Sequence, residues 1–595
     1  MRDKLSDKLT IFVRFILQCK LLTFPAVALV LVACATGGDP DDAASAEEVE
    51  DAVAELPPDG GDAGGDSDLD PELVFHVLAA ERLMAVGDFE DALGHYLTAA
   101  RIGEDLELAR QSVRVAMRVN DWERMAEAAT LWGDLAPEPG AGREFLILAR
   151  INSGDPARAA EPLAESIRQT DDAREAWREA VVLLSAAQEE ARALAVFDAL
   201  VQETGEDAAA AHVLESRSLL MWQLGKGDEA LRLALLAADS DAGRDSLVWA
   251  AQLAAAEDDL DVALDLYRRA RADDPDDAAL GMAEAEVLRQ LERMDDAILV
   301  LQSLSPDSEV LYTLGTFLVR QDRVDEAAEV WRDLVAIEAP DDSDQHAFLA
   351  GFLAELLEFD EEALAWYEQV QAGPNVNRAL LRRGIILGDN GDLFTARNLL
   401  RSVRLGDERD LSEESLLVEA DLLREADRAD EAVDLLTEAV RERPANVALL
   451  YSRAICAVAA DDLELAEQDF RRILQLEDDN AMALNALGYT LTDRTDRHGE
   501  AYRLIRRAYE LEPDSPAILD SMGWVYYRQG HPDKALPYLE RALEGEDNSE
   551  IAAHLVEVLW VLDRRDEARE LLSEYAAMFP DDPFLTETGS RLGIN

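Results

Sequence analysis

Apolar residues recur along most of the chain with a period close to 34 residues. Residues 483–489 read ALNALGY and residues 518–524 read ILDSMGW, so the two glycines lie 35 residues apart. Around the first glycine, Leu487 and Leu491 are four residues apart, which places them on one face of a helix. The pattern therefore predicts pairs of amphipathic helices, each pair burying its apolar face against the next.

An alanine marks each repeat. Ala501 follows Gly488 by thirteen residues, and Ala535 follows Gly523 by twelve. The mean spacing of these alanines along the chain is 34 residues. The register predicts fifteen repeats, at Ala92, Ala126, Ala160, Ala193, Ala230, Ala263, Ala297, Ala327, Ala363, Ala396, Ala432, Ala466, Ala501, Ala535 and Ala568.

A small residue lies twelve positions before the alanine in many repeats, and a proline lies twelve positions after it in several. Antiparallel helices approach closely only where side chains are small, and proline ends the second helix because it cannot continue it. The predicted packing pairs are Gly315 with Ala327, Gly351 with Ala363, Gly384 with Ala396, Gly488 with Ala501, and Gly523 with Ala535. Four repeats place a larger residue at the small position, and we expect divergent, more open hairpins there: Arg114, Leu148, Val181 and Val556.

This repeat resembles the tetratricopeptide repeat, a 34-residue unit of helix, turn and helix. The resemblance implies an all-α, right-handed superhelical solenoid of about fifteen helical hairpins. Residues 71–240 form a divergent N-terminal part, and residues 241–595 form a more regular array, most regular at 480–545. A generic helical protein or a coiled coil is the alternative, but a coiled coil needs a seven-residue repeat without glycine and proline interruptions.

The first 33 residues have the features of a lipoprotein signal peptide. Basic residues precede an apolar run at 21–32, which is shorter than the roughly 20 residues that span a bilayer. The run ends in LVAC, which resembles the lipobox of bacterial lipoproteins. That resemblance implies cleavage between Ala33 and Cys34, acylation of the Cys34 thiol and, with Ala35 next, an outer-membrane location. The alternatives are cleavage after Ala35, which gives a soluble periplasmic protein, and an uncleaved anchor.

Acidic residues dominate the chain, with 125 Asp and Glu against 56 Lys and Arg and a net charge of −69. This balance argues against binding nucleic acid, which needs clustered cations. After the cysteine, residues 35–70 hold thirteen acids and no Lys or Arg, so we expect residues 34–70 to be a lipidated, disordered tether. Three cysteines, Cys19, Cys34 and Cys456, do not make a disulfide framework.

No enzyme motif is found in the sequence. It contains no HExxH, GxSxG, phosphate-binding glycine loop or CxxC, and its seven histidines are scattered over separate repeats. We therefore expect no catalytic residues, no metal site and no cofactor. An enzyme whose site has no recognisable motif is a distant alternative.

The first helix of each hairpin lines the inner groove in solenoids of this kind. Positions three before, one after and four after the small residue fall on that face. Aromatic residues beside polar groups suit protein recognition, since Trp and Tyr dominate binding hot spots. The predicted partner-binding residues are Asn485, Tyr489, Asp520, Trp524, Tyr527, Phe348 and Phe352. The alternative is that Trp524 and Tyr527 only pack against the next helix.

Residues 483–543 look like one group of tetratricopeptide proteins, through LGYTL at 487–491, DRTDR at 493–497 and AILDSMGW at 517–524. These are proteobacterial outer-membrane lipoproteins (the LbcA type) that partner a carboxy-terminal processing serine protease. The resemblance implies an adaptor that brings the protease its substrates, which are cell-wall hydrolases. The alternative is a scaffold lipoprotein for outer-membrane protein insertion or polysaccharide export.

Overall fold

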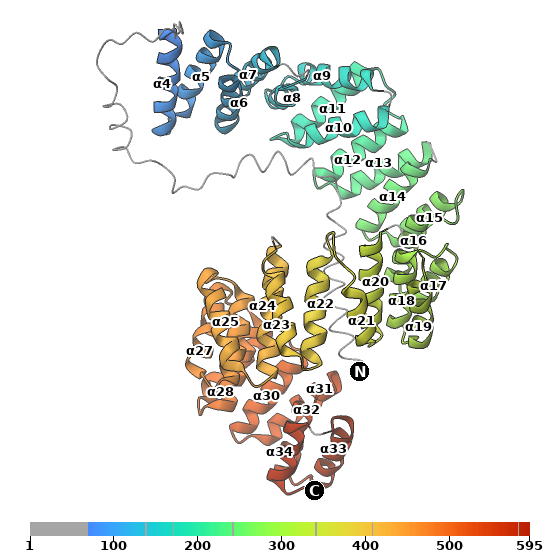
Figure 1. Ribbon diagram of the computed structural model, residues 1–595, viewed down its shortest axis with the longest axis vertical. Helices are drawn as coiled ribbons and strands as arrows, with labels where there is room; N and C mark the ends of the chain where they lie inside the picture. The colour runs from blue at the N-terminus through green and yellow to red at the C-terminus, as the bar shows by residue number, and fades with distance from the viewer. Residues whose placement is uncertain are drawn as a thin grey trace. The chain divides into compact units, whose positions relative to one another are not determined.

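The structure is a computed structural model that describes residues 70–594, except 137–139, 171, 241–242, 339–341, 407 and 581. All regular secondary structure in these residues is α-helical, in helices α4 to α34 (Figure 1). The predicted signal peptide, Ala33, Cys34 and the tether up to residue 69 lie outside the described residues. The all-α prediction is confirmed.

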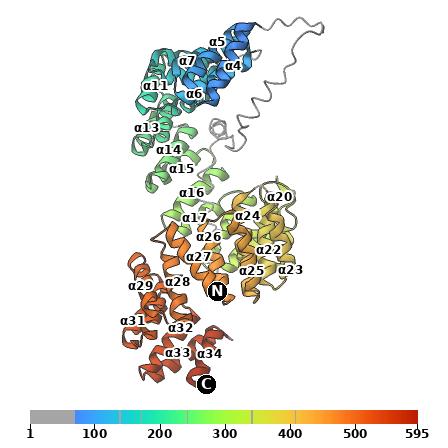
Figure 2. The same ribbon diagram turned by 90° about the vertical axis from the view of Figure 1, so that its left-hand side faces the viewer.

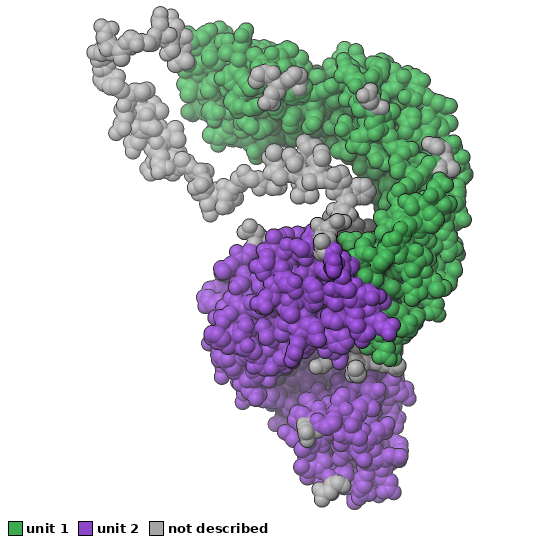
Figure 3. All heavy atoms as spheres, turned by 45° about the vertical axis from the view of Figure 1, so that its right-hand side comes forward, with its two compact units in different colours: residues 1–327 green, residues 328–595 purple. Residues whose placement is uncertain are grey.

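Packing divides the chain into two compact units, residues 1–327 and 328–595 (Figure 3). This division follows contacts, whereas the expected boundary at 240/241 concerns the regularity of the repeats and stays a prediction. The helices of the first unit are α4 (Pro71–Ala85), α5 (Phe89–Gly103), α6 (Leu106–Val119), α7 (Trp122–Leu135), α8 (Arg143–Asn152), α9 (Pro156–Gln169), α10 (Ala173–Ser185), α11 (Glu190–Thr204), α12 (Ala211–Gln223), α13 (Gly227–Ser240), α14 (Arg244–Ala256), α15 (Leu260–Arg271), α16 (Ala278–Gln290), α17 (Met294–Gln302) and α18 (Ser308–Arg320).

The boundary between the units falls within α19 (Val324–Val335). Within each unit, even-numbered and odd-numbered helices alternate as first and second helices of successive hairpins, and α34 is added after the last one (Figure 2). The helices of the second unit are α20 (Ser343–Leu356), α21 (Asp360–Tyr367), α22 (Val376–Asp389), α23 (Leu393–Val403), α24 (Arg409–Glu425), α25 (Ala429–Glu442), α26 (Val447–Ala459), α27 (Leu463–Leu476), α28 (Ala481–Arg494), α29 (His498–Leu511), α30 (Pro516–Arg528), α31 (Pro532–Gly545), α32 (Ser549–Val561), α33 (Arg565–Met578) and α34 (Pro583–Leu592).

A tight turn joins the two helices of thirteen hairpins. The residue two before the second helix has a positive φ, which glycine, asparagine and aspartate tolerate best. The exceptions are the α10–α11 and α28–α29 turns, and the second of these contains the extra residue that separates Gly488 from Ala501 by thirteen positions. The left-handed residues are Gly87, Asn120, Gly154, Gly225, Asp258, Glu292, Asp322, Glu358, Gly391, Asp427, Asp461, Gly530 and Asp563.

The fourth residue of every second helix, from α5 to α33, closes the first turn of that helix and is fully buried. Thirteen of the predicted alanines occupy this position. In α7 and α9 the position belongs to Met125 and Ala159, so the predicted Ala126 and Ala160 are one residue late. Both helices contain several alanines, and an alanine alone therefore does not fix the register.

The same one-residue shift applies to the small position in α6 and α8, the helices that precede α7 and α9. Val113 is buried at the α6 crossing in place of the expected Arg114, which is exposed. Ile147 is buried at the α8 crossing in place of the expected Leu148. The α10–α11 hairpin, which contains Val181, is open. Its two helices pack less closely on each other than α11 packs on α9 and α10 packs on α12. The α32–α33 hairpin, with Val556 at its crossing, stays closed.

Glycine at the crossing allows one large side chain to fill the hairpin. A Cβ built on Gly523 would lie 2.5 Å from Leu539 Cγ, and one on Gly488 would lie 2.5 Å from Ile505 Cγ1. The residue that meets the glycine is four positions after the alanine, one turn further along the second helix. The same geometry holds where Gly351 faces Tyr367 and Gly384 faces Leu400, at 2.9 Å in both cases.

Replacing Gly523 tests this contact. We expect Gly523→Ala to lower the free energy of unfolding by about 1–3 kcal/mol, because the added methyl group overpacks against buried Leu539. Gly499→Ala is the matched control, since a Cβ there meets nothing within 4 Å and α29 gains helix propensity. Urea unfolding followed by circular dichroism measures both, and equal effects of the two variants would contradict the crossing model.

Candidate protein-binding surface

First helices form the crowded side of the second unit. The backbones of α22 and α24, α24 and α26, α28 and α30, α30 and α32, and α32 and α34 approach one another directly. In a stack of hairpins that curves, the helices on the inner side lie closest together. The first helices therefore present the inner surface of this unit.

Four side chains from three successive first helices meet at its C-terminal end. The Trp524 ring stacks on the His554 imidazole, with centroids 3.9 Å apart and an interplanar angle of 18°. His554 Nδ1 lies 2.8 Å from Asp520 Oδ1, and both side chains are buried. The Tyr489 ring of α28 also lies beside the imidazole, tilted by 45° and 6.2 Å away between centroids.

Two tyrosine–carboxylate hydrogen bonds extend this group. The Tyr489 hydroxyl donates to Glu550, and the Tyr527 hydroxyl donates to Glu557 Oε2 at 3.1 Å. Arg591 of α34 forms an ion pair with buried Glu557. Polar side chains thus link α28 to α32, α30 to α32, and α32 to α34. We call this set the C-terminal ladder: Asn485, Tyr489, Asp520, Trp524, Tyr527, Glu550, His554, Glu557 and Arg591.

The ladder shifts the pKa values of its own members. Burial opposes charge on His554, but the Asp520 carboxylate, together with Glu550 and Glu557, raises its pKa above the ordinary value. Burial raises the pKa of Glu550 and of Tyr489. Burial and then the Glu557 charge raise the pKa of Tyr527 to about 12. The tyrosines therefore act as hydrogen-bond donors and not as acids.

Five of the predicted partner-binding residues are brought together in the ladder, but not all are exposed. Trp524 is only 5% exposed, so the expectation of an exposed ring is wrong there and the packing alternative holds for most of its surface. Asn485, Tyr489 and Tyr527 are half-buried and reach the surface. Asn485 Oδ1 and Trp524 Nε1 are buried atoms without a hydrogen-bond partner in the described part of the chain.

Phe348 and Phe352 lie apart from the ladder, in the core of the second unit. Their rings stack on each other at 6.2 Å, and Phe348 also contacts the Tyr367 ring at 5.8 Å. They are 6% and 4% exposed, so the expectation that they present an open aromatic surface is wrong. The spacing rule fails because α20 is buried continuously from His346 to Glu355.

Sequence reasoning missed the contribution of α32. Glu557 follows the crossing residue Val556 by one position, and the same offset that identified Trp524 finds it. Valine at the small position marks a divergent repeat, so the predicted binding residues do not extend to this helix. His554 lies two positions before Val556, outside the offsets used, so only its contact with Asp520 reveals it.

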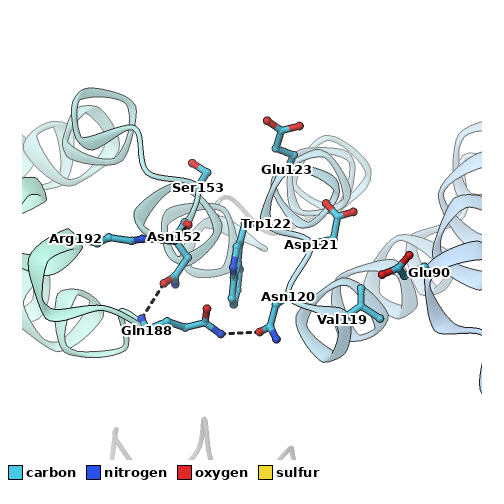
Figure 4. A pocket seen from close by; sticks show the side chains of 10 residues that line it. All are labelled: Glu90, Val119, Asn120, Asp121, Trp122, Glu123, Asn152, Ser153, Gln188 and Arg192. Atoms are coloured by element: carbon cyan, nitrogen blue, oxygen red, sulfur yellow. Dashed lines mark hydrogen bonds between the residues drawn. The ribbon is translucent and has the colours of Figure 1, made fainter.

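A polar hollow in the first unit is formed by the turns of successive hairpins (Figure 4). Gln188 connects two of them, with its backbone N–H donating to Asn152 Oδ1 at 2.8 Å and its side-chain Nε2 donating to Asn120 Oδ1 at 2.6 Å. Arg192 donates to the Asn152 carbonyl at the same place. These groups satisfy one another, so we interpret the hollow as a seam between hairpins.

The described residues contain no group of three or more His, Cys, Asp or Glu side chains placed to hold a metal ion. None of their helices combines the length and the apolar character needed to cross a bilayer.

The hairpins and their crossings define the fold class, an all-α solenoid of helical hairpins. Family models described as tetratricopeptide repeats match residues 248–308, 417–481 and 526–584. Over 210 residues the chain is 42% identical to the TPR repeat-containing protein PA4667 of Pseudomonas aeruginosa. That match spans 35% of each chain, so the chain covers about a third of the length of this relative.

Solved structures with similar helices include a tetratricopeptide repeat protein from Parabacteroides merdae. It is 17% identical, with a TM-score of 0.37 over 42% of this chain and 99% of its own. The Naa15/Naa10 complex bound to HypK-THB contains a chain 14% identical, with a TM-score of 0.35 over 88% of this chain and 94% of its own. The Cut9–Hcn1 complex contains one 15% identical, with a TM-score of 0.30 over 82% of this chain and 97% of its own.

The His554–Asp520 pair predicts a pH dependence. Because folding raises the pKa of His554, its charged form stabilises the fold fully below about pH 6.5, and this contribution is lost as pH rises through the folded value. We expect His554→Phe, which keeps a ring against Trp524, to cost about 2 kcal/mol at pH 6 and less at pH 9. Urea unfolding at both pH values measures this, with His531→Phe on an exposed turn as control. A cost that does not change with pH would contradict the assignment.

Proposed function

We propose that the protein is a non-enzymatic adaptor that binds another protein on the first-helix face of its second unit. The observation that carries this proposal is the C-terminal ladder, where the half-buried tyrosines lie over buried side chains that are hydrogen-bonded to one another. Tyrosines held in this way offer a large contact area at a low entropy cost, which is typical of binding hot spots. Protein-interaction scaffolding is the general role of tetratricopeptide repeats, and this chain contains them.

The ladder is better suited to binding than to catalysis. Its buried carboxylates are occupied: Asp520 by His554, and Glu557 by Tyr527 and Arg591. A general acid or base needs a free position beside the reacting atoms.

The finer proposal concerns the partner and the location. The chain is an outer-membrane lipoprotein, held by a lipid on Cys34, that recruits a periplasmic carboxy-terminal processing protease and its cell-wall hydrolase substrates. It is supported by the LVAC sequence at 31–34 and by the resemblance of residues 483–543 to lipoproteins with that partner. A tether between lipid and solenoid raises the local concentration of partners near the cell wall.

Affinity capture tests the partner. The full-length protein, solubilised from envelopes with detergent, is expected to retain the processing protease, and the double change Asn485→Ala and Tyr527→Ala is expected to reduce capture at least about tenfold, or 1.4 kcal/mol. Phe394→Ala is the control, because this 79% exposed residue lies on second helix α23. Failure to capture the protease, with capture of outer-membrane insertion or polysaccharide-export proteins instead, would favour the scaffold alternative.

Palmitate labelling tests the anchor. We expect the wild-type protein to incorporate labelled palmitate and Cys34→Ala to lose all incorporation, because only the thiol at the lipobox accepts the lipid. Cys19→Ala serves as the control for loss of a cysteine elsewhere in the leader. Labelling that survives Cys34→Ala would rule out this attachment, and release of an unlabelled protein into the periplasm would support cleavage after Ala35.

A further inference from the structure

Two neighbouring second helices carry matching stripes of aromatic and basic residues. On α29 the stripe is Tyr502, Arg506 and Tyr509, and on α31 it is Lys534, Tyr538 and Arg541. Both stripes have the spacing i, i+4, i+7, which places their members on one helical face. Figure 2 shows α29 and α31 next to each other in the second unit.

The two stripes meet through their rings. The Tyr502 and Tyr526 hydroxyls are 3.1 Å apart, and the Tyr526 ring stacks on Tyr538 at 5.7 Å between centroids. Tyr538 in turn contacts the edge of Tyr509, also at 5.7 Å. A continuous row of four half-buried tyrosines therefore runs between the helices. We call these four tyrosines, with Arg506, Lys534 and Arg541, the tyrosine–cation patch.

The cations of the patch are available to a partner. Lys534 lies 5.8 Å from the Tyr526 ring centroid and makes no ion pair among the described residues. Arg506 pairs only with Glu510 at 3.4 Å, and Arg541 pairs with Asp514 at 3.1 Å. Those two carboxylates are 63% and 93% exposed, so the pairs are weak and easily exchanged. Some other arginines are held more firmly by buried carboxylates, as Arg453 is by Asp469.

The tyrosine rings of the patch also do more than pack in the core. A core tyrosine buries its hydroxyl on a partner, whereas the Tyr538 hydroxyl has no hydrogen-bond partner in the described part of the chain and is not buried. Tyr509 receives only a long hydrogen bond of 3.3 Å from Arg541. Phenol hydroxyls and cations that alternate along a helical face match carboxylates that alternate with apolar side chains.

We propose that the tyrosine–cation patch is a second docking surface, which binds an acidic segment of a partner protein. It lies on second helices α29 and α31, with Tyr526 contributed by first helix α30, and it shares no residue with the ladder. Charge complementarity selects the occupant: in a chain of net charge −69, an acidic segment is repelled by most of the surface and is attracted where weakly paired cations lie together beside aromatic rings. The repulsion elsewhere favours this place over the rest of the surface.

A defined peptide tests the proposal with the full-length protein in detergent. The probe is a fluorescein-labelled peptide of alternating glutamate and leucine, and binding is followed by anisotropy at low and at physiological salt. We expect saturable binding that weakens as salt rises, and a loss of at least about tenfold in affinity in the double variant Arg506→Glu and Lys534→Glu. The control is Arg441→Glu with Arg472→Glu, the same change of charge at exposed positions of α25 and α27.

A second variant separates recognition from loss of folding. Tyr538→Phe removes only the free hydroxyl and keeps the stacked ring, so we expect weaker peptide binding with unchanged urea unfolding. The Asn485→Ala and Tyr527→Ala variant of the ladder is expected to bind the acidic peptide normally, so failure of either proposal leaves the other standing.

Four results would overturn the proposal. They are equal binding of a lysine–leucine peptide, an equal loss in the Arg441 and Arg472 control, and binding of anionic phospholipid vesicles through Arg506 and Lys534 in place of the peptide. The fourth is peptide binding that appears only after deletion of residues 39–70, because the acidic segment of the chain itself would then be the occupant.

Discussion

The close approach of two helices at each crossing is the interaction on which the rest of the structure depends. A glycine or alanine on the first helix and a buried alanine on the second allow one large side chain, such as Leu539 against Gly523, to fill the hairpin. Because the contact leaves almost no free volume, it also fixes the rotation of each helix about its axis. Rotation decides which residues face inward and which face the neighbouring hairpin. The ladder and the tyrosine–cation patch both follow from it.

The second constraint is that buried carboxylates need paired, hydrogen-bonded cations, and it explains the preference for arginine over lysine. Several carboxylates are buried between helices, and a buried charge is tolerated only when it is paired and hydrogen-bonded. Glu284 accepts hydrogen bonds from Arg268 and Arg271 at 2.8 and 2.7 Å. Asp469 accepts two hydrogen bonds from the Arg453 guanidinium, both at 2.7 Å. The planar guanidinium supplies this bidentate geometry, and lysine does not. Most of the remaining acids lie at exposed turns and helix starts, where the helix dipole favours them.

Much of the fold could be predicted from spacing alone, because the crossing demands small residues at fixed intervals. The predicted register is wrong only in α7 and α9. In α7, Met125 occupies the position that alanine occupies elsewhere, and in both helices a neighbouring alanine has the expected spacing. The site was harder, since a spacing rule gives the face of a helix and not what covers that face. Tyr489 reaches the surface, whereas Phe352 at the equivalent position is buried by its own neighbours. His554 escaped prediction because its role comes from Asp520, 34 residues away.

The two surfaces of the second unit differ in how their polar groups are satisfied, and this difference separates their tasks. In the ladder, Asp520, Glu550 and Glu557 already have partners within the chain, so the surface binds through its shape and the area of its rings. In the tyrosine–cation patch the cations are free or weakly paired, so an acidic partner gains new ion pairs without breaking buried ones. A preorganised surface limits the entropy lost on binding, whereas a charged surface speeds encounter and depends on salt. An adaptor that holds one protein while it receives another needs both kinds of surface, on faces that do not compete.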